Sequence, residues 1–134
     1  MRILALLLVL VGCAADVPVE EFVDGQAAPT DFVLAKVSGD RDGDRTAARV
    51  VFEDGARQLV LDITLAYDPQ PVLALGEWTL GDESGPVQAE VVRFVGGQGE
   101  GPSVGGVYRL DTLEGDSRFR VNVPLTPVEE SWGP

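Results

Sequence analysis

The sequence contains no histidine, a single cysteine and a single lysine among its 134 residues. Without histidine, the chain cannot form Ser-His-Asp or Cys-His nucleophilic sites, and it has no imidazole for proton transfer. The one cysteine, Cys13, has no partner for a disulfide, so we expect the fold to be stabilised by its core. Carboxylates alone are a poor zinc ligand set, which argues against a zinc centre.

Nothing else in the sequence indicates catalysis. Lys36 lies in a predicted strand, and we interpret it as a surface or sheet-edge residue. Residues 96–106 are rich in glycine, but they join two predicted strands and hold no basic residue that would meet a phosphate. Adjacent acids such as Asp82-Glu83 lie in turns, where carboxylates are usually solvated rather than paired for glycoside hydrolysis. We therefore predict a protein that is not an enzyme and binds no exchangeable cofactor.

The charge of the chain is strongly one-sided. Twenty-two acidic residues face ten basic ones, for a net charge of −12 at pH 7. Such a charge repels nucleic acid and anionic lipid surfaces, so neither is expected as a partner. Association with a membrane would therefore require a lipid anchor.

The first residues contain a candidate for such an anchor. Arg2 precedes an apolar run over residues 3–11, which is too short to cross a bilayer and has the length of a signal-peptide core. The run ends in Leu10-Val11-Gly12-Cys13, which resembles the lipobox of bacterial lipoproteins. The resemblance implies cleavage before Cys13 and attachment of diacylglycerol and fatty acyl chains to that residue. A plain secretory signal is the alternative.

The same resemblance also predicts in which membrane the protein is anchored. In lipoproteins of Gram-negative cells, an aspartate after the lipidated cysteine favours retention in the inner membrane, and here that position is Ala14. For a Gram-negative cell, the resemblance therefore implies a protein anchored in the outer membrane, on a face that the sequence leaves open. We divide the chain into a signal peptide (residues 1–12), a lipidated cysteine with an acidic tether (13–30), a β-domain (31–126) and a C-terminal tail (127–134).

Most of the predicted domain follows the two-residue period of β-strands, and no segment keeps a helical period for two turns. Asp54-Gly55 and Glu114-Gly115-Asp116 are hairpin signals between neighbouring runs. We predict an all-β fold, a single small antiparallel β-sandwich of about seven strands, with a β-barrel as the alternative. The apolar runs are residues 31–37, 48–54, 57–67, 72–80, 87–95, 106–113 and 117–125.

Alternation within three runs predicts which side chains face the core. Between Val91 and Val92 the apolar phase slips by one residue, which predicts a β-bulge. The predicted core positions of the third and last runs are Leu59, Leu61, Ile63 and Leu65, and Phe119, Val121, Val123 and Leu125.

Three alternate aspartates form a candidate metal site. Asp40, Asp42 and Asp44 have the Asp-x-Asp-x-Asp spacing of the first half of calcium loops. The position that needs glycine is Arg45 and the one that needs the bidentate acid is Val51, so the pattern is incomplete. We interpret the segment as a solvated hairpin between strands that end at Val37 and begin near Arg45. At most weak, millimolar calcium binding is predicted.

Two functions of different classes remain open. The first is an accessory or protein-interaction module of a cell-envelope assembly, for which Trp132 in the tail is a candidate contact residue. The second is a small-ligand carrier with an apolar cavity lined by residues such as Trp78, Phe94 and Tyr108. Gly76-Glu77-Trp78 is similar to the Gly-x-Trp motif of lipocalins, although in that family the motif lies on the first strand. A filled core would favour the interaction module, and an open interior would favour the carrier.

Overall fold

The computed structural model describes residues 18–42, 45–67, 70–95 and 102–130. These residues form ten strands and no helix, which confirms the predicted all-β class. In these ranges no helix is long and apolar enough to span a membrane. The strands are β1 (Val19–Val23), β2 (Gln26–Pro29), β3 (Val33–Asp42), β4 (Arg45–Glu53), β5 (Gln58–Tyr67), β6 (Pro71–Leu80), β7 (Glu83–Val95), β8 (Ser103–Asp111), β9 (Ser117–Pro127) and β10 (Glu129–Glu130).

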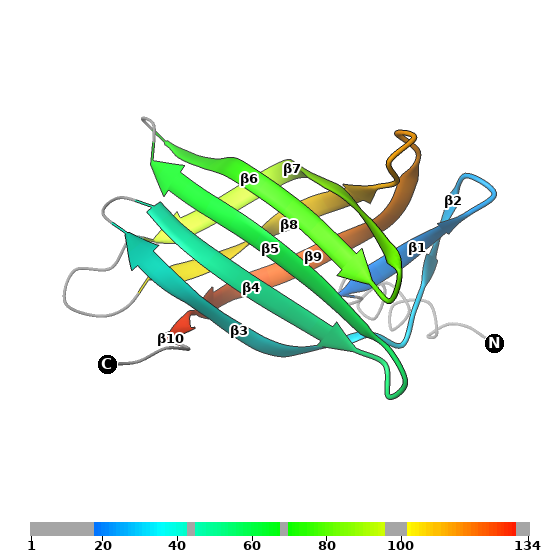
Figure 1. The fold of residues 1–134 in the computed structure, drawn as a ribbon, viewed down its shortest axis with the longest axis horizontal. Coiled ribbons are helices and arrows are strands. Elements are labelled where there is room, and N and C mark those ends of the chain that lie inside the picture. The colour runs from blue at the N-terminus through cyan, green and yellow to red at the C-terminus, as the bar shows by residue number, and fades with distance from the viewer. Residues whose placement is uncertain (1–17, 43–44, 68–69, 96–101, 131–134) are drawn as a thin grey trace, which may run out of the picture.

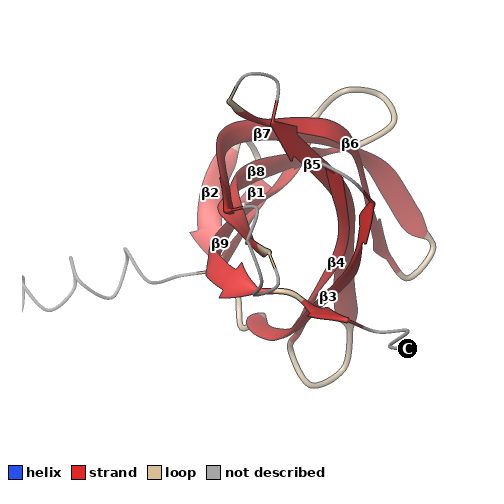
Figure 2. Cartoon of the chain, turned by 90° about the vertical axis from the view of Figure 1, so that its left-hand side faces the viewer, coloured by secondary structure: helices blue, strands red, loops and turns tan. Residues whose placement is uncertain are grey.

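All ten strands belong to one curled sheet, in the order β10-β3-β4-β5-β6-β7-β8-β9-β1-β2 (Figures 1 and 2). From β3 to β9, each strand pairs antiparallel with the next. Because β10 follows β9 in the chain and pairs parallel with β3, it brings the two ends of this meander together. The predicted seven-strand sandwich is not confirmed. The seven predicted runs correspond to β3–β9, and three further strands come from segments without a predicted strand.

The expected tether over residues 13–30 is wrong for residues 19–29, which form the β1–β2 hairpin. Its turn is Asp24-Gly25, where both residues have positive φ (53° and 82°), the conformation of a type I′ turn. β1 also pairs with β9, and Val19 is fully buried in the core. The hairpin is therefore part of the folded domain.

The C-terminal tail also contributes to the sheet. Val128 is buried, and its amide donates to the carbonyl of Pro102 at 2.9 Å. The next two residues form β10, opposite Ser38 and Gly39 of β3. Trp132 lies outside the described residues, so its predicted contact stays a prediction.

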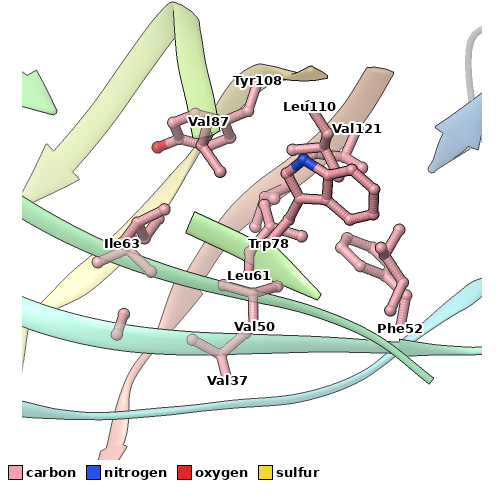
Figure 3. Packing of buried hydrophobic residues seen from close by; sticks show 14 of the residues in the cluster. Val37, Val50, Phe52, Leu61, Ile63, Trp78, Val87, Tyr108, Leu110 and Val121 are labelled. Carbon is pink, nitrogen blue, oxygen red and sulfur yellow. The ribbon is translucent and has the colours of Figure 1, made fainter. Parts of the chain in front are cut away.

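The core fills the space inside the curled sheet (Figure 3). Trp78 lies near its centre, with its ring edge-on to Phe119 at 5.7 Å between centroids. Its indole nitrogen donates to the carbonyl oxygen of Asp111 at 2.8 Å, so the buried polar atom is paired. The predicted core positions of β5 are confirmed, since Leu59, Leu61, Ile63 and Leu65 are at most 2% exposed.

β-Bulges determine which side chains of β7 and β9 face the core. The register of β7 against β8 shifts between Ala89 and Val91, which confirms a bulge in this strand but places it before Val91 rather than after it. A second shift lies where Gly106 pairs with Val123 and Val104 with Thr126, so the phase of β9 changes after Val123. Leu125 was predicted to face the core and is instead 47% exposed, because this bulge turns it outward.

Candidate functional site

Ion pairs link β9 to β1 and to β7. Two arginines of β9 each bridge acids from two other strands, and hydrogen bonding from Arg118 lowers the pKa of Glu83 below its usual range. Exposed pairs of this kind contribute little stability each, but they give each of these charged side chains a partner of opposite charge. The pairs are Arg118 with Glu21 and with Glu83 (3.0 Å), and Arg120 with Glu90 (2.9 Å) and with Glu20 (3.8 Å).

The outer face of β3–β6 has a groove of about 1080 Å³, which we call the outer groove. Strand register places two rows of outward side chains along it, while residues 84–86 and Leu113 close one side. The rows are Ser38-Arg49-Asp62-Glu77 and Asp40-Ala47-Thr64-Leu75. In the second row, the short side chains of Ala47 and Thr64 lie between the longer ones of Asp40 and Leu75.

The surface of the outer groove is mainly apolar and has one ion pair at its centre. Arg49 donates to Asp62 at 2.8 Å, and this hydrogen bond raises the pKa of the arginine. Leu75 and Leu113 are 68% and 77% exposed, which is unusual for large aliphatic side chains that share one hollow. The arrangement offers apolar contact area with a fixed charge pair to orient a bound surface.

A second, smaller hollow of about 430 Å³ lies between β6 and β7, and we call it the β6–β7 slot. The two strands pair only from Glu77 to Leu80 on β6 and from Glu83 to Pro86 on β7. Beyond that point they diverge, and the slot is lined by residues 71–76 of β6 and by residues 87–90 and Val92 of β7.

The three aromatic residues considered for a ligand cavity are core residues. Trp78, Phe94 and Tyr108 are 1%, 5% and 0% exposed and belong to one hydrophobic cluster. The hydroxyl of Tyr108 donates to the carbonyl oxygen of Gly105 at 2.7 Å, and burial raises its pKa. None of the three lines the outer groove or the β6–β7 slot. Gly76-Glu77-Trp78 lies on β6, in the middle of the meander.

The aspartate motif is only partly described. β3 continues to Asp42, which pairs with Arg45 of β4, so the strand is longer than predicted and the expected loop after Val37 is wrong. Asp40 is an exposed strand residue opposite Ala47. The side chain of Asp42 and all of Asp44 lie outside the description, so weak calcium binding stays a prediction.

The calcium prediction has a direct test. Calorimetry should detect at most millimolar affinity, because the bidentate acid of a calcium loop is missing. Micromolar affinity that is lost in Asp42→Ala would contradict it. Among the described residues, no group of three or more metal-ligating side chains is found.

Comparisons with known proteins find no matching family model, no matching curated protein and no matching solved structure. A function for this chain is therefore inferred from its own residues and geometry. Sequence reasoning missed both hollows. The alternation of β3–β6 marks which side chains face outward, but only strand register and the divergence of β6 from β7 bring them around a hollow. Cys13 lies outside the described residues.

Proposed function

We propose that this chain is a lipid-anchored outer-membrane lipoprotein without catalytic activity, and that it acts as a protein-interaction module of a cell-envelope assembly. The lipobox resemblance at Cys13 supports the anchor. The outer groove supports the interaction, because it is the largest apolar hollow described here and two exposed leucines lie on it.

The short connection to the anchor also supports a role close to the membrane. β1 begins at Val19, so residues 14–18 are the only link between the lipidated Cys13 and the folded domain. Even fully extended, this link spans at most about 20 Å. The domain would stay within that distance of the lipid surface, where a partner in the same membrane is readily met.

The filled interior favours a protein partner over a carried ligand. A carrier needs an apolar cavity that encloses its ligand. The aromatic residues that would line one are buried in the core instead, with Trp78 edge-on to Phe119 and Phe94 stacked on Tyr67 at 5.0 Å. The hollow surface lies on the outside of the sheet, where another protein can reach it.

The interaction is tested by photo-cross-linking in intact cells of the source bacterium. A photoreactive amino acid replaces Leu113 on the outer groove, and the same residue at Leu125 is the matched control because Leu125 is also exposed but lies outside the groove. We expect one dominant protein adduct at Leu113 and none at Leu125. Equal adducts at both positions, or no adduct at Leu113, would refute the interaction surface.

The anchor is tested separately with Cys13→Ser. The wild-type mature protein should carry a diacylglycerol and fatty acyl chains by mass spectrometry and should partition into detergent. The variant should lose the added mass and leave the membrane fraction, since lipid chains supply the binding energy of such anchors. A variant that stays membrane-bound at unchanged mass would refute the lipobox assignment.

A further inference from the structure

We infer that the β6–β7 slot binds an extended segment of a partner protein as an added β-strand. The inference rests on the proposed function as an interaction module and names a mode of recognition for it. It places the contact in a gap between two strands, where main-chain groups of both strands are free.

The pairing of β6 and β7 shows where the free edges lie. Among the residues that the structure describes, β6 pairs only with β5 from Gly76 toward its N-terminal end, and β7 pairs only with β8 from Val87 toward its C-terminal end. Each strand therefore presents one row of main-chain amides and carbonyls toward the slot. Such rows are strong hydrogen-bonding groups that template the addition of a strand.

A bulge in each strand keeps the slot open. The register of β6 shifts by one residue at Ala74, and that of β7 shifts at Glu90. Bulges bend a strand and increase its twist, so the two strands separate where both carry one. At the closed end the strands touch, since a Cβ added to Gly76 would lie 2.8 Å from Cβ of Val87.

Tyr67 of β5 closes the other end of the slot. Its hydroxyl donates to the carbonyl oxygen of Phe94 on β7, and its ring stacks on that of Phe94 at 5.0 Å. From Val87 to Phe94 the distance along an extended strand is about 23 Å, the length of a seven-residue segment. The slot is thus bounded at both ends and suits a short strand.

The side chains of the slot define the chemistry of the occupant. Apart from Pro71 at its end, the β6 side of the slot has no charge and no proline, the two features by which free edges are usually protected from pairing. Leu73 and Val92 are partly buried against the core, and Leu75 is exposed. An added strand with apolar residues at alternate positions would cover the inward pair.

Charge favours a basic occupant. Glu90, which Arg120 already pairs at 2.9 Å, is the one ionisable residue among those that line the slot, so the attraction comes mainly from the net charge of −12 on the whole chain. Lysine or arginine between the apolar positions would therefore be attracted to the slot. A second copy of this chain would bring the same negative charge, which disfavours it as the occupant.

The test uses the purified full chain in zwitterionic nanodiscs and labelled seven-residue peptides. In these peptides lysine alternates with valine, isoleucine, phenylalanine or tyrosine. The best peptide should bind with a dissociation constant below about 1 mM. Methylation of its main-chain nitrogens should weaken binding about tenfold, because the added strand depends on main-chain hydrogen bonds. Hydrogen exchange should slow at residues 72–76 and 88–93.

Two variants locate the binding. Ala74→Lys should weaken the peptide about tenfold by placing a like charge at the slot, because Ala74 is exposed there and does not line the outer groove, while Leu125→Lys, an exposed control on β9, should leave binding unchanged. Tyr67→Phe should tighten binding several-fold, because it frees the carbonyl of Phe94 and keeps the ring stack.

Three results would overturn the inference. The first is a dissociation constant above about 1 mM for every peptide of the set. The second is equal binding of the methylated and unmethylated peptides. The third is a concentration-dependent dimer of the chain that protects the same amides. Each leaves the cross-link expected at Leu113 untouched, because Leu113 does not line the slot. Failure of the strand-binding mode is therefore distinguishable from failure of the interaction module.

Discussion

Replacing Gly85 with alanine should damage the core more than replacing any turn glycine. An added Cβ would lie 2.0 Å from the carbonyl oxygen of Asp111 and 2.9 Å from the indole nitrogen of Trp78. These are the two atoms joined by the buried 2.8 Å hydrogen bond, so the methyl group would be forced into that bond. Either the end of β8 must move or the bond must break.

The magnitude follows from two costs. Overpacking of a tight core costs about 1–3 kcal/mol. A buried donor or acceptor left unpaired costs a further 1–3 kcal/mol or so. We therefore expect Gly85→Ala to lower the free energy of unfolding by about 2–6 kcal/mol, a large share of the roughly 5–15 kcal/mol typical of a domain.

Urea unfolding, followed by far-ultraviolet circular dichroism, measures this loss. Gly81→Ala is the matched control, because Gly81 has a φ of 59° and no atom within 4 Å of the added Cβ. It should cost only the backbone strain of about 1–2 kcal/mol. A Gly85→Ala loss equal to or smaller than that of the control would refute the packing argument.

Three further predictions follow from the core, the ion pairs and the tail. Leu61→Ala, at a fully buried site, should lower the free energy of unfolding by about 2–5 kcal/mol in the same assay, and a loss below 1 kcal/mol or so would contradict the burial. Arg118 lowers the pKa of Glu83 from 4.5, so the pair stabilises the fold while Glu83 is charged. Because the pair is exposed, Glu83→Gln should lower the free energy of unfolding by less than about 1 kcal/mol. This difference in stability between wild type and variant should be fully present at pH 7 and should disappear as the pH falls below 4.5 through the lower pKa of the folded state. A stability difference that does not change with pH would contradict this. In Trp78→Phe, acrylamide reports on Trp132 alone. We expect partial protection from quenching, as a tail folded back onto the domain would give, and free quenching would contradict this and favour Trp132 as a contact residue for a partner.

Local signals were sufficient for most strands. The alternation of Leu59, Leu61, Ile63 and Leu65 is unambiguous, because every second residue is aliphatic and burial of one face follows directly. The β1–β2 hairpin was predictable too, since Asp24-Gly25 is the same hairpin signal that was recognised at Asp54-Gly55. Its two strands are short, and residues 19–29 carry three acidic residues, which is also the composition of a solvated tether.

Other features had no local signal. Leu125 continues the alternation of Phe119, Val121 and Val123, and only a shift of register against β8 turns it outward. Such a bulge depends on the partner strand, and the sequence of β9 alone does not reveal it. β10 was likewise invisible, because two residues carry no period.

The sequence by itself determined the strand-forming runs, most of the core-facing side chains, the charge, and the residues of the resemblance to a lipoprotein signal. These depend on side-chain chemistry and on spacing along one segment. Tertiary structure decided that ten strands form one curled sheet, that Trp78 fills the interior, and that β6 and β7 diverge to leave the slot. Those features depend on which strands pair and where their registers shift, and pairing is set by the packing of distant segments against each other rather than by any single stretch of chain.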